Sequence, residues 1–246
     1  MKIITIILSL LVTISIFASN VETVKRSLTS KIIQTKKTGK MPIVIFDIDH
    51  TIINSSPRIK KILKDANKKY YSKALAKYLK DDKNSSFRYK QIKELLISLK
   101  VKPKKIEKIL KYVDSKFFLS DYTKYDVALV ESLKLVNEFY KKGAFIIYLT
   151  ARGRSSLVGT ITSLDRLGFP IAKTRTSLIM RDLSKKSVKY KKDSIAELST
   201  MGKIVAIFDD KIANLKQLTP FFKDQYSLYL VNSKTKNKKI SSINLK

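Results

Sequence analysis

The fold is decided by the stretch PIVIFDIDHT, which occupies residues 42–51. Four consecutive apolar residues follow Pro42 and end at Asp47. A strand with one buried face alternates apolar and polar side chains, whereas a strand of a parallel sheet is covered by helices on both faces and is apolar throughout. The stretch therefore predicts a central parallel strand, with the carboxylates of Asp47 and Asp49 just beyond its end.

Further apolar runs predict the other strands of the sheet. Four segments are mostly apolar and short enough to be strands: 144–149, 178–180, 204–208 and 226–231. The first of these runs ends at Thr150, and the third ends at the pair Asp209-Asp210. Together with the strand before Asp47, three predicted strands therefore end in side chains that carry oxygen.

Helical patterns separate these strands. Apolar residues recur at the helical spacing of about 3.6 positions in three segments, which are 155–167, 191–201 and 212–218. Strands that alternate with helices are typical of parallel sheets with helices on both faces. The sequence therefore predicts an α/β fold, a three-layer, Rossmann-like, doubly wound parallel sheet.

The segment 54–142 interrupts this alternation. It is rich in Lys and Leu, it lacks Gly, and its apolar residues have helical spacing. It is several times longer than the dozen or so residues that a crossover between parallel strands needs, so we expect a helical cap inserted between the first strand and Thr150. The predicted organisation has a signal peptide (1–19), a linker (20–41), a core domain (42–53 and 143–246) and the cap (54–142).

The N-terminus predicts export. Met1-Lys2 gives a short positive start, residues 3–17 are apolar or hydroxylated, and Ala18-Ser19 offers small residues for cleavage. An apolar run of this length suits a signal peptide and is short for a membrane span. We expect a periplasmic or secreted protein; an uncleaved segment that anchors the chain in a membrane is the alternative.

Composition excludes several kinds of site. The chain has no Cys and a single His, His50, which rules out disulfides, thiolate metal sites and a cysteine nucleophile and disfavours a histidine-rich zinc site. Its 51 Lys and Arg residues against 20 Asp and Glu residues give a net charge of +31. Such a charge attracts anions, including nucleic acid and phosphorylated small molecules. Because the lysines are spread along the whole chain, a general bias toward Lys is the competing explanation.

The predicted strand ends suggest a metal site. If the three strands are neighbours, four carboxylates (Asp47, Asp49, Asp209 and Asp210) and the hydroxyl of Thr150 meet at one edge of the sheet. Crowded carboxylates repel one another unless a cation lies among them. Oxygen ligands without sulfur favour Mg²⁺.

These motifs resemble those of the haloacid dehalogenase superfamily. The similar segments are Ile-Phe-Asp47-Ile-Asp49-His-Thr51, Tyr-Leu-Thr150, a Lys before a helix, and Asp209-Asp210, in that order over residues 42–231. The resemblance implies a phosphatase in which Asp47 forms an aspartyl-phosphate and Asp49 is the general acid and base. It also implies that Thr150 and a Lys bind the phosphoryl oxygens. Asp47, Asp209, Asp210 and the carbonyl of Asp49 would hold Mg²⁺ directly or through its waters.

The third motif has three candidate lysines, Lys189, Lys191 and Lys192, and its spacing before the helix favours Lys191. The segment from Thr150 to Arg154 resembles exported acid phosphatases of the same superfamily. We expect Thr51 and Arg152 to contact the substrate, with a surface charge as the alternative for Arg152.

The sequence is compatible with three functions. The preferred one is an exported, magnesium-dependent phosphatase that acts on phosphorylated small molecules. The charge favours a variant of it that acts on nucleotides or nucleic-acid ends, with nucleic acid as a partner. The third is a basic binding protein that keeps the fold without catalysis; the presence of Asp47, Asp49 and Asp209 argues against it. A membrane is a partner only if the N-terminal segment is not cleaved.

Overall fold

A parallel sheet forms the centre of the molecule. The computed structural model describes residues 21–81, 86–117, 119–182, 184, 187–220, 226–232 and 240–245. Within them the main strands are β1 (Pro42–Phe46), β4 (Phe145–Gly153), β5 (Thr176–Arg181), β6 (Lys203–Asp209), β7 (Ser227–Val231) and β8 (Ile240–Ile243). They form one sheet of six strands in the order β5-β4-β1-β6-β7-β8, and all neighbours are parallel. The five strands expected from the sequence are present, and β8 was not expected.

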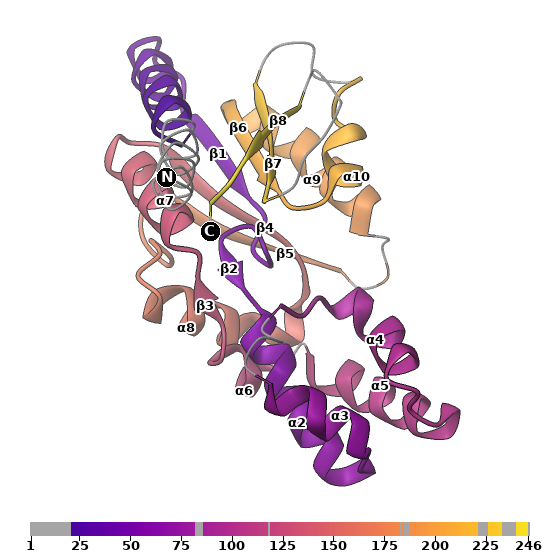
Figure 1. The fold of residues 1–246 in the computed structure, drawn as a ribbon. Coiled ribbons are helices and arrows are strands. Elements are labelled where there is room, and N and C mark those ends of the chain that lie inside the picture. Colours follow the sequence, from indigo (N-terminus) through magenta and orange to yellow (C-terminus); the bar gives the residue numbers. More distant parts are fainter. Residues whose placement is uncertain are drawn as a thin grey trace, which may run out of the picture.

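Helices cover both faces of the sheet and make three layers (Figure 1). One face carries the helix of residues 21–37, α7 (Val130–Lys141) and α8 (Leu157–Arg166), and the other carries α9 (Ser187–Met201) and α10 (Ile212–Lys216). Val44 and Phe46 of β1 pack in the first core, whereas Ile43 and Ile45 pack in the second. Burial on both faces explains the unbroken apolar run, and the three-layer α/β prediction is confirmed.

The predicted linker at 20–41 is wrong. Residues 21–37 form a helix, and Val21, Val24, Leu28 and Ile32 lie in the core on one face of the sheet. Leu28 and Ile32 are 0% exposed. The four residues have helical spacing, but polar residues occupy every position between them. So narrow a stripe does not by itself distinguish a helix from a basic linker; the sheet face that it covers decides the matter.

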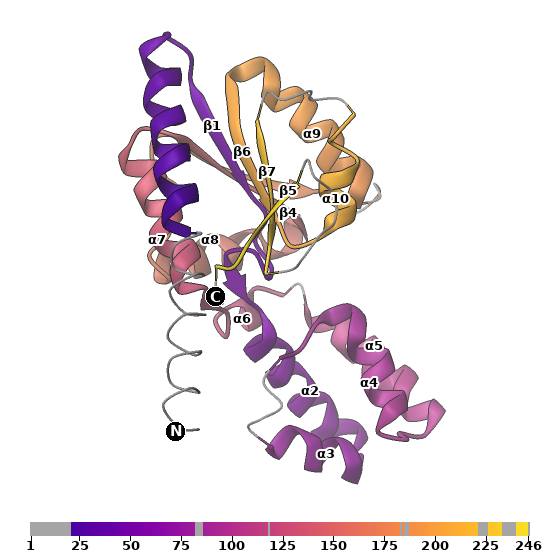
Figure 2. The ribbon, with the colours of Figure 1, turned by 45° about the horizontal axis from the view of Figure 1, so that its top comes forward.

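The cap is a separate helical layer with its own core. It contains α2 (Ser56–Tyr70), α3 (Lys73–Lys80), the 3₁₀ turn η1 (Tyr89–Gln91), α4 (Ile92–Ser98) and α5 (Pro103–Phe117). Their apolar faces pack together in a cluster that contains no residue of the main sheet. Figure 2 shows these helices extending away from the carboxyl end of β1, so the inserted helical cap is also confirmed.

The chain enters and leaves the cap at one place. The short strands β2 (Ile53–Asn54) and β3 (Val127–Ala128) pair antiparallel there. The expected cap boundary at residue 142 is wrong, because Leu135, Val136 and Phe139 of α7 lie in the core of the sheet. A helix packed on a sheet and a helix packed in a cap have the same periodicity, so the sequence did not separate them. No helix among the described residues is long and apolar enough to cross a membrane, and the predicted signal peptide at 1–19 lies outside those residues.

Candidate active site

The carboxyl ends of three adjacent strands form the site. Asp47 follows β1, Thr150 lies in β4 on one side, and Asp209 ends β6 on the other. The main-chain N–H of Asp47 donates to the carbonyl of Phe208 at 2.9 Å, which fixes Asp47 beside the end of β6. All three polar side chains are buried. The expected meeting of these strand ends at one edge is therefore present.

A tight turn follows Asp47 and places Asp49 beyond the strand. The amides of Thr51, Ile52 and Ile53 all donate to the carbonyl of Ile48. His50 has a φ of 64°, a left-handed conformation that His adopts more readily than most residues. Burial lowers the pKa of His50 to about 4, so its ring is neutral near pH 7, and it shares a hydrogen bond of 3.2 Å with Ser55.

Lys191 lies between two of the strand-end carboxylates. Its Nζ is 2.6 Å from Asp47 Oδ1 and 2.7 Å from Asp209 Oδ2. Burial acts to lower the pKa of Lys191, but the charges of Asp209 and Asp47 raise it, so the side chain is an ammonium ion. Lys189 is exposed and Lys192 is half-buried. Of the three candidates, the structure places Lys191 at the site.

Asp47, Asp209 and Asp210 form a group whose carboxylate oxygens lie within 4.8 Å of one another. Burial raises the pKa of Asp47, although Lys191 opposes this, and burial with the charge of Asp47 raises the pKa of Asp210 to about 7. Oδ1 of Asp210 is buried and has no hydrogen-bond partner among the described residues. An orphaned carboxylate oxygen beside two other carboxylates fits a hard divalent cation such as Mg²⁺.

Asp209 is the most strongly held of these carboxylates. Its Oδ1 accepts hydrogen bonds from the main-chain N–H of Lys211 at 2.8 Å and from Asn214 Nδ2 at 3.0 Å. Asn214 Nδ2 also contacts Oδ2 at 2.8 Å. The start of α10 thus fixes the orientation of the carboxylate at the end of β6.

A second cluster surrounds Asp49. Arg152 donates Nε to Asp49 Oδ2 at 2.9 Å and Nη2 to Asp126 Oδ2 at 2.9 Å. Arg58, from the first turn of α2, pairs with Asp49 Oδ1 at 2.5 Å and with Asp126 Oδ1 at 3.2 Å. Both guanidinium groups are fully buried. Burial alone would raise the pKa of Asp49, but Arg152 and Arg58 hold it well below the usual carboxyl range, so Asp49 is ionised.

The predicted site residues thus fall into two adjoining clusters. Asp47, Lys191, Asp209 and Asp210 form one, and Thr51 joins it through a 3.2 Å hydrogen bond from Oγ1 to Asp47 Oδ2. Asp49 and Arg152 form the other. The carboxylate of Asp49 is not part of the group formed by Asp47, Asp209 and Asp210, and a metal contact of its carbonyl stays a prediction.

Thr150 and Arg152 face protein groups in this arrangement. Thr150 Oγ1 accepts the main-chain N–H of Arg152 at 3.1 Å. The guanidinium of Arg152 is enclosed by Asp49, Asp126 and Thr160 and holds Asp49 in place. Their contacts with substrate stay predictions.

Sequence reasoning missed four residues of the site: Arg58, Arg88, Asp126 and Asn214. Arg58 and Asp126 lie on the two chain segments that border the β2–β3 pair, and Arg88 belongs to the cap. In a chain with 51 basic residues, no local pattern marks two arginines as special. Asn214 is the exception, because an amide five residues after a strand-end Asp, in the first turns of the next helix, is a signal that can be read.

Comparison with known proteins identifies a family. The family model described as "HAD superfamily, subfamily IIIB (Acid phosphatase)" matches residues 104–238, more than half of the 246 residues. A comparison with curated proteins found no match.

Two solved structures with TM-scores above 0.5 show the same fold. A candidate phosphatase from Clostridium difficile is 14% identical with a TM-score of 0.55, over 78% of this chain and 86% of that one. A haloacid dehalogenase-like hydrolase from Streptococcus pneumoniae is 10% identical with a TM-score of 0.52, over 85% of this chain and 95% of that one. The class C acid phosphatase from Bacillus anthracis is 20% identical with a TM-score of 0.48, over 81% of this chain and 63% of that one. This chain therefore spans less than two thirds of the length of the last protein.

Proposed function

This chain belongs to HAD superfamily subfamily IIIB, the acid phosphatases, and we propose that it hydrolyses phosphate monoesters of small molecules with Asp47 as the nucleophile. The observation that carries the proposal is the position of Lys191, whose Nζ lies 2.6 Å from Asp47 and 2.7 Å from Asp209. A buried ammonium ion among strand-end carboxylates suits a reaction in which negative charge moves over phosphoryl oxygens.

The proposed reaction has two steps. An oxygen of Asp47 forms a bond to phosphorus while the bond to the ester oxygen breaks, and the leaving oxygen takes a proton from Asp49. A water molecule then attacks the aspartyl-phosphate and gives its proton to Asp49, which releases phosphate and regenerates Asp47. Asp49 is ionised beside Arg58 and Arg152, so it must take up a proton before the first step.

The remaining residues of the site would stabilise charge. Lys191 would neutralise the charge on the phosphoryl oxygens, and the hydroxyls of Thr150 and Thr51 would donate hydrogen bonds to them. Arg152 and Arg58 would hold Asp49 in position through their ion pairs with its carboxylate. The fold already holds Lys191 and Thr51 beside Asp47 through hydrogen bonds.

We propose Mg²⁺ as the cofactor. Asp47, Asp209 and Asp210 would hold it, with the main-chain carbonyl of Asp49. The support is the group of three carboxylates within 4.8 Å and the unpartnered Oδ1 of Asp210. When bound, the cation would reduce the negative charge of the phosphoryl group and of its three carboxylate ligands.

Hydrolysis of p-nitrophenyl phosphate tests the function. The wild-type protein should hydrolyse this ester after Mg²⁺ is added, and hydrolysis should stop when EDTA is in excess. Asp47→Asn should lower kcat by several orders of magnitude, because an amide has the shape of a carboxylate but is not a nucleophile. Asp165→Asn, an exposed site on α8, is the matched control and should be unchanged. If Asp47→Asn keeps more than about a hundredth of wild-type activity, Asp47 is not the nucleophile.

We also propose export through the N-terminal segment. The support is its sequence alone: a basic start at Lys2, an apolar run at 3–17 and small residues at 18–19. The mass of the intact protein purified from its native host should correspond to a chain that begins near residue 20. A full-length mass in the membrane fraction would show an anchor instead.

A further inference from the structure

The cap contributes Arg88 to the carboxylate edge of the core. Nη1 of Arg88 donates to Asp210 Oδ2 at 2.8 Å. This contact joins the segment before η1 to the end of β6, 122 positions along the chain. The side chain of Asp210 is 1% exposed, whereas that of Arg88 is 39% exposed. A guanidinium has five N–H donors, and among the described residues the hydrogen bond to Asp210 uses one of those of Arg88.

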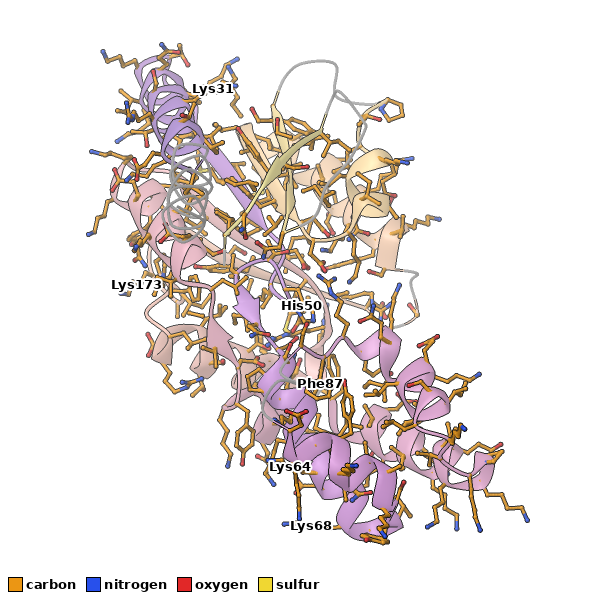
Figure 3. All side chains as sticks on the ribbon, in the orientation of Figure 1. Lys31, His50, Lys64, Lys68, Phe87 and Lys173 are labelled. Carbon is orange, nitrogen blue, oxygen red and sulfur yellow. The ribbon has the colours of Figure 1, made fainter. Side chains whose placement is uncertain are left out.

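The position of Arg88 is set by the residue before it. The main-chain N–H of Phe87 donates to Ser56 Oγ at 3.0 Å, and Ser56 Oγ donates to the carbonyl of Phe87 at 3.1 Å. The Phe87 ring is buried in the core of the cap and meets Tyr78 edge to face. Figure 3 labels Phe87, which belongs to the cap, and His50, which belongs to the turn after β1. The main chain next to Arg88 is therefore anchored to Ser56 of α2.

Arg88 differs from Lys191, Arg58 and Arg152 in its exposure. Lys191 is enclosed between Asp47 and Asp209, and its side chain is buried. Arg58 and Arg152 are fully enclosed around Asp49. Among these four side chains, only that of Arg88 both contacts a carboxylate of the group Asp47, Asp209 and Asp210 and is exposed to solvent.

We propose that Arg88 binds a second anionic group of the substrate, a phosphate or a carboxylate one or two bonds from the reacting phosphoryl group. The proposal rests on the proposed phosphatase function and names the substrate class for it. A guanidinium binds either group through two parallel hydrogen bonds. A divalent cation at Asp47, Asp209 and Asp210 would offset the charge that now pairs with Arg88, and would leave the guanidinium for the substrate.

Two matched pairs of substrates test this specificity. Ethyl phosphate and phosphoglycolate differ by a carboxylate, and methyl phosphate and methyl diphosphate differ by a phosphate. Arg88→Gln should raise KM for phosphoglycolate or for methyl diphosphate, the two substrates with a second anionic group. The rise should be about tenfold or more, as expected for the loss of a charge-assisted hydrogen bond. KM for the two simple esters should rise by a smaller factor, because these esters lack the second anionic group that Arg88 would bind. The pair that responds identifies the second group.

Lys90→Gln is the control, because Lys90 is an exposed cation two residues further along the cap segment. It removes the same charge and should change all four KM values equally and little. Arg88→Lys keeps the positive charge but lacks the planar guanidinium with its two parallel donors. It should raise KM for the responding substrate by less than Arg88→Gln does. It also supplies the test if Arg88→Gln does not fold. The inference is overturned if both Arg88 variants raise KM equally for substrates with and without a second anionic group. It is also overturned if Lys90→Gln changes the KM values as Arg88→Gln does.

A binding measurement separates this inference from the proposed function. In the Asp47→Asn background, calorimetry gives the Kd of phosphoglycolate and of methyl diphosphate without turnover. Adding Arg88→Gln should weaken the binding of one of them by about tenfold and leave inorganic phosphate nearly unchanged. If wild type hydrolyses none of the esters but this difference is present, the function fails and the anion site stands. If esters are hydrolysed and the difference is absent, the function stands and the anion site fails.

Discussion

Replacing Lys191 by Met removes the ammonium group that lies between Asp47 and Asp209. Met has a similar length, so the change leaves little empty space and acts mainly through charge. Two buried carboxylates then face each other without their shared partner. Removing one member of a buried ion pair costs about 3–5 kcal/mol. For a chain of this size that corresponds to a fall in Tm of about 6–20 °C in EDTA.

The assay is thermal unfolding of wild type, Lys191→Met and Lys189→Met in EDTA. Lys189 is exposed, so its replacement should change stability by less than about 0.5 kcal/mol. The difference between Lys191→Met and wild type should shrink from about pH 8 to about pH 5, because protonation of an unpaired buried carboxylate removes its charge. With Mg²⁺ present, Lys191→Met should also lower kcat by about 100-fold or more.

Equal stability of wild type and Lys191→Met in EDTA would refute the argument, because it would mean that the two carboxylates do not depend on the ammonium group. A larger loss in Lys189→Met would show that another lysine occupies this position. A difference that grows as the pH falls would contradict the electrostatic explanation, even if the variant were less stable.

Three further predictions concern the cation, the second cluster and the N-terminal helix. Mg²⁺ at about 100 times its Kd should stabilise the fold by about 2.7 kcal/mol in thermal unfolding, and no shift would exclude a site at the carboxylates. Arg152→Met should cost about 3–5 kcal/mol, because Asp49 and Asp126 lose a buried partner; urea unfolding measures it, and a neutral result would contradict the role of Arg152 in holding Asp49. Leu28→Ala should cost about 2–5 kcal/mol, whereas Ile33→Ala, at a side chain that is 39% exposed, should cost much less; equal costs would mean that the helix does not pack on the sheet in solution.

The surface charge has no such specific explanation. The labelled lysines in Figure 3, Lys31, Lys64, Lys68 and Lys173, lie on the N-terminal helix, on the cap and on the core domain. They do not form one stripe. This agrees with a general bias toward Lys as the source of the net charge of +31. Arg88, in contrast, has a specific contact with Asp210.

The sequence by itself determined five strands of the sheet and the edge at which their polar ends meet. An apolar run that ends in Asp, as before Asp47 and Asp209, is compatible with few structures except a strand buried on both faces. Because parallel strands place their carboxyl ends at the same edge, the strand ends also predicted which side chains meet there. The signal is local, and each residue needs only its own strand to be placed.

The tertiary structure alone decided the residues whose role depends on distant partners. Lys189, Lys191 and Lys192 lie on one helix in a chain full of lysines, and only the packing of α9 against the sheet turns Lys191 toward Asp47. Arg58 and Arg88 have no pattern of their own, because their partners lie in separate segments of the chain. The helix of residues 21–37 has so narrow a stripe of apolar residues that only its packing on the sheet distinguishes it from a linker. Contacts between segments far apart in sequence are fixed by packing, and packing is a property of the whole fold.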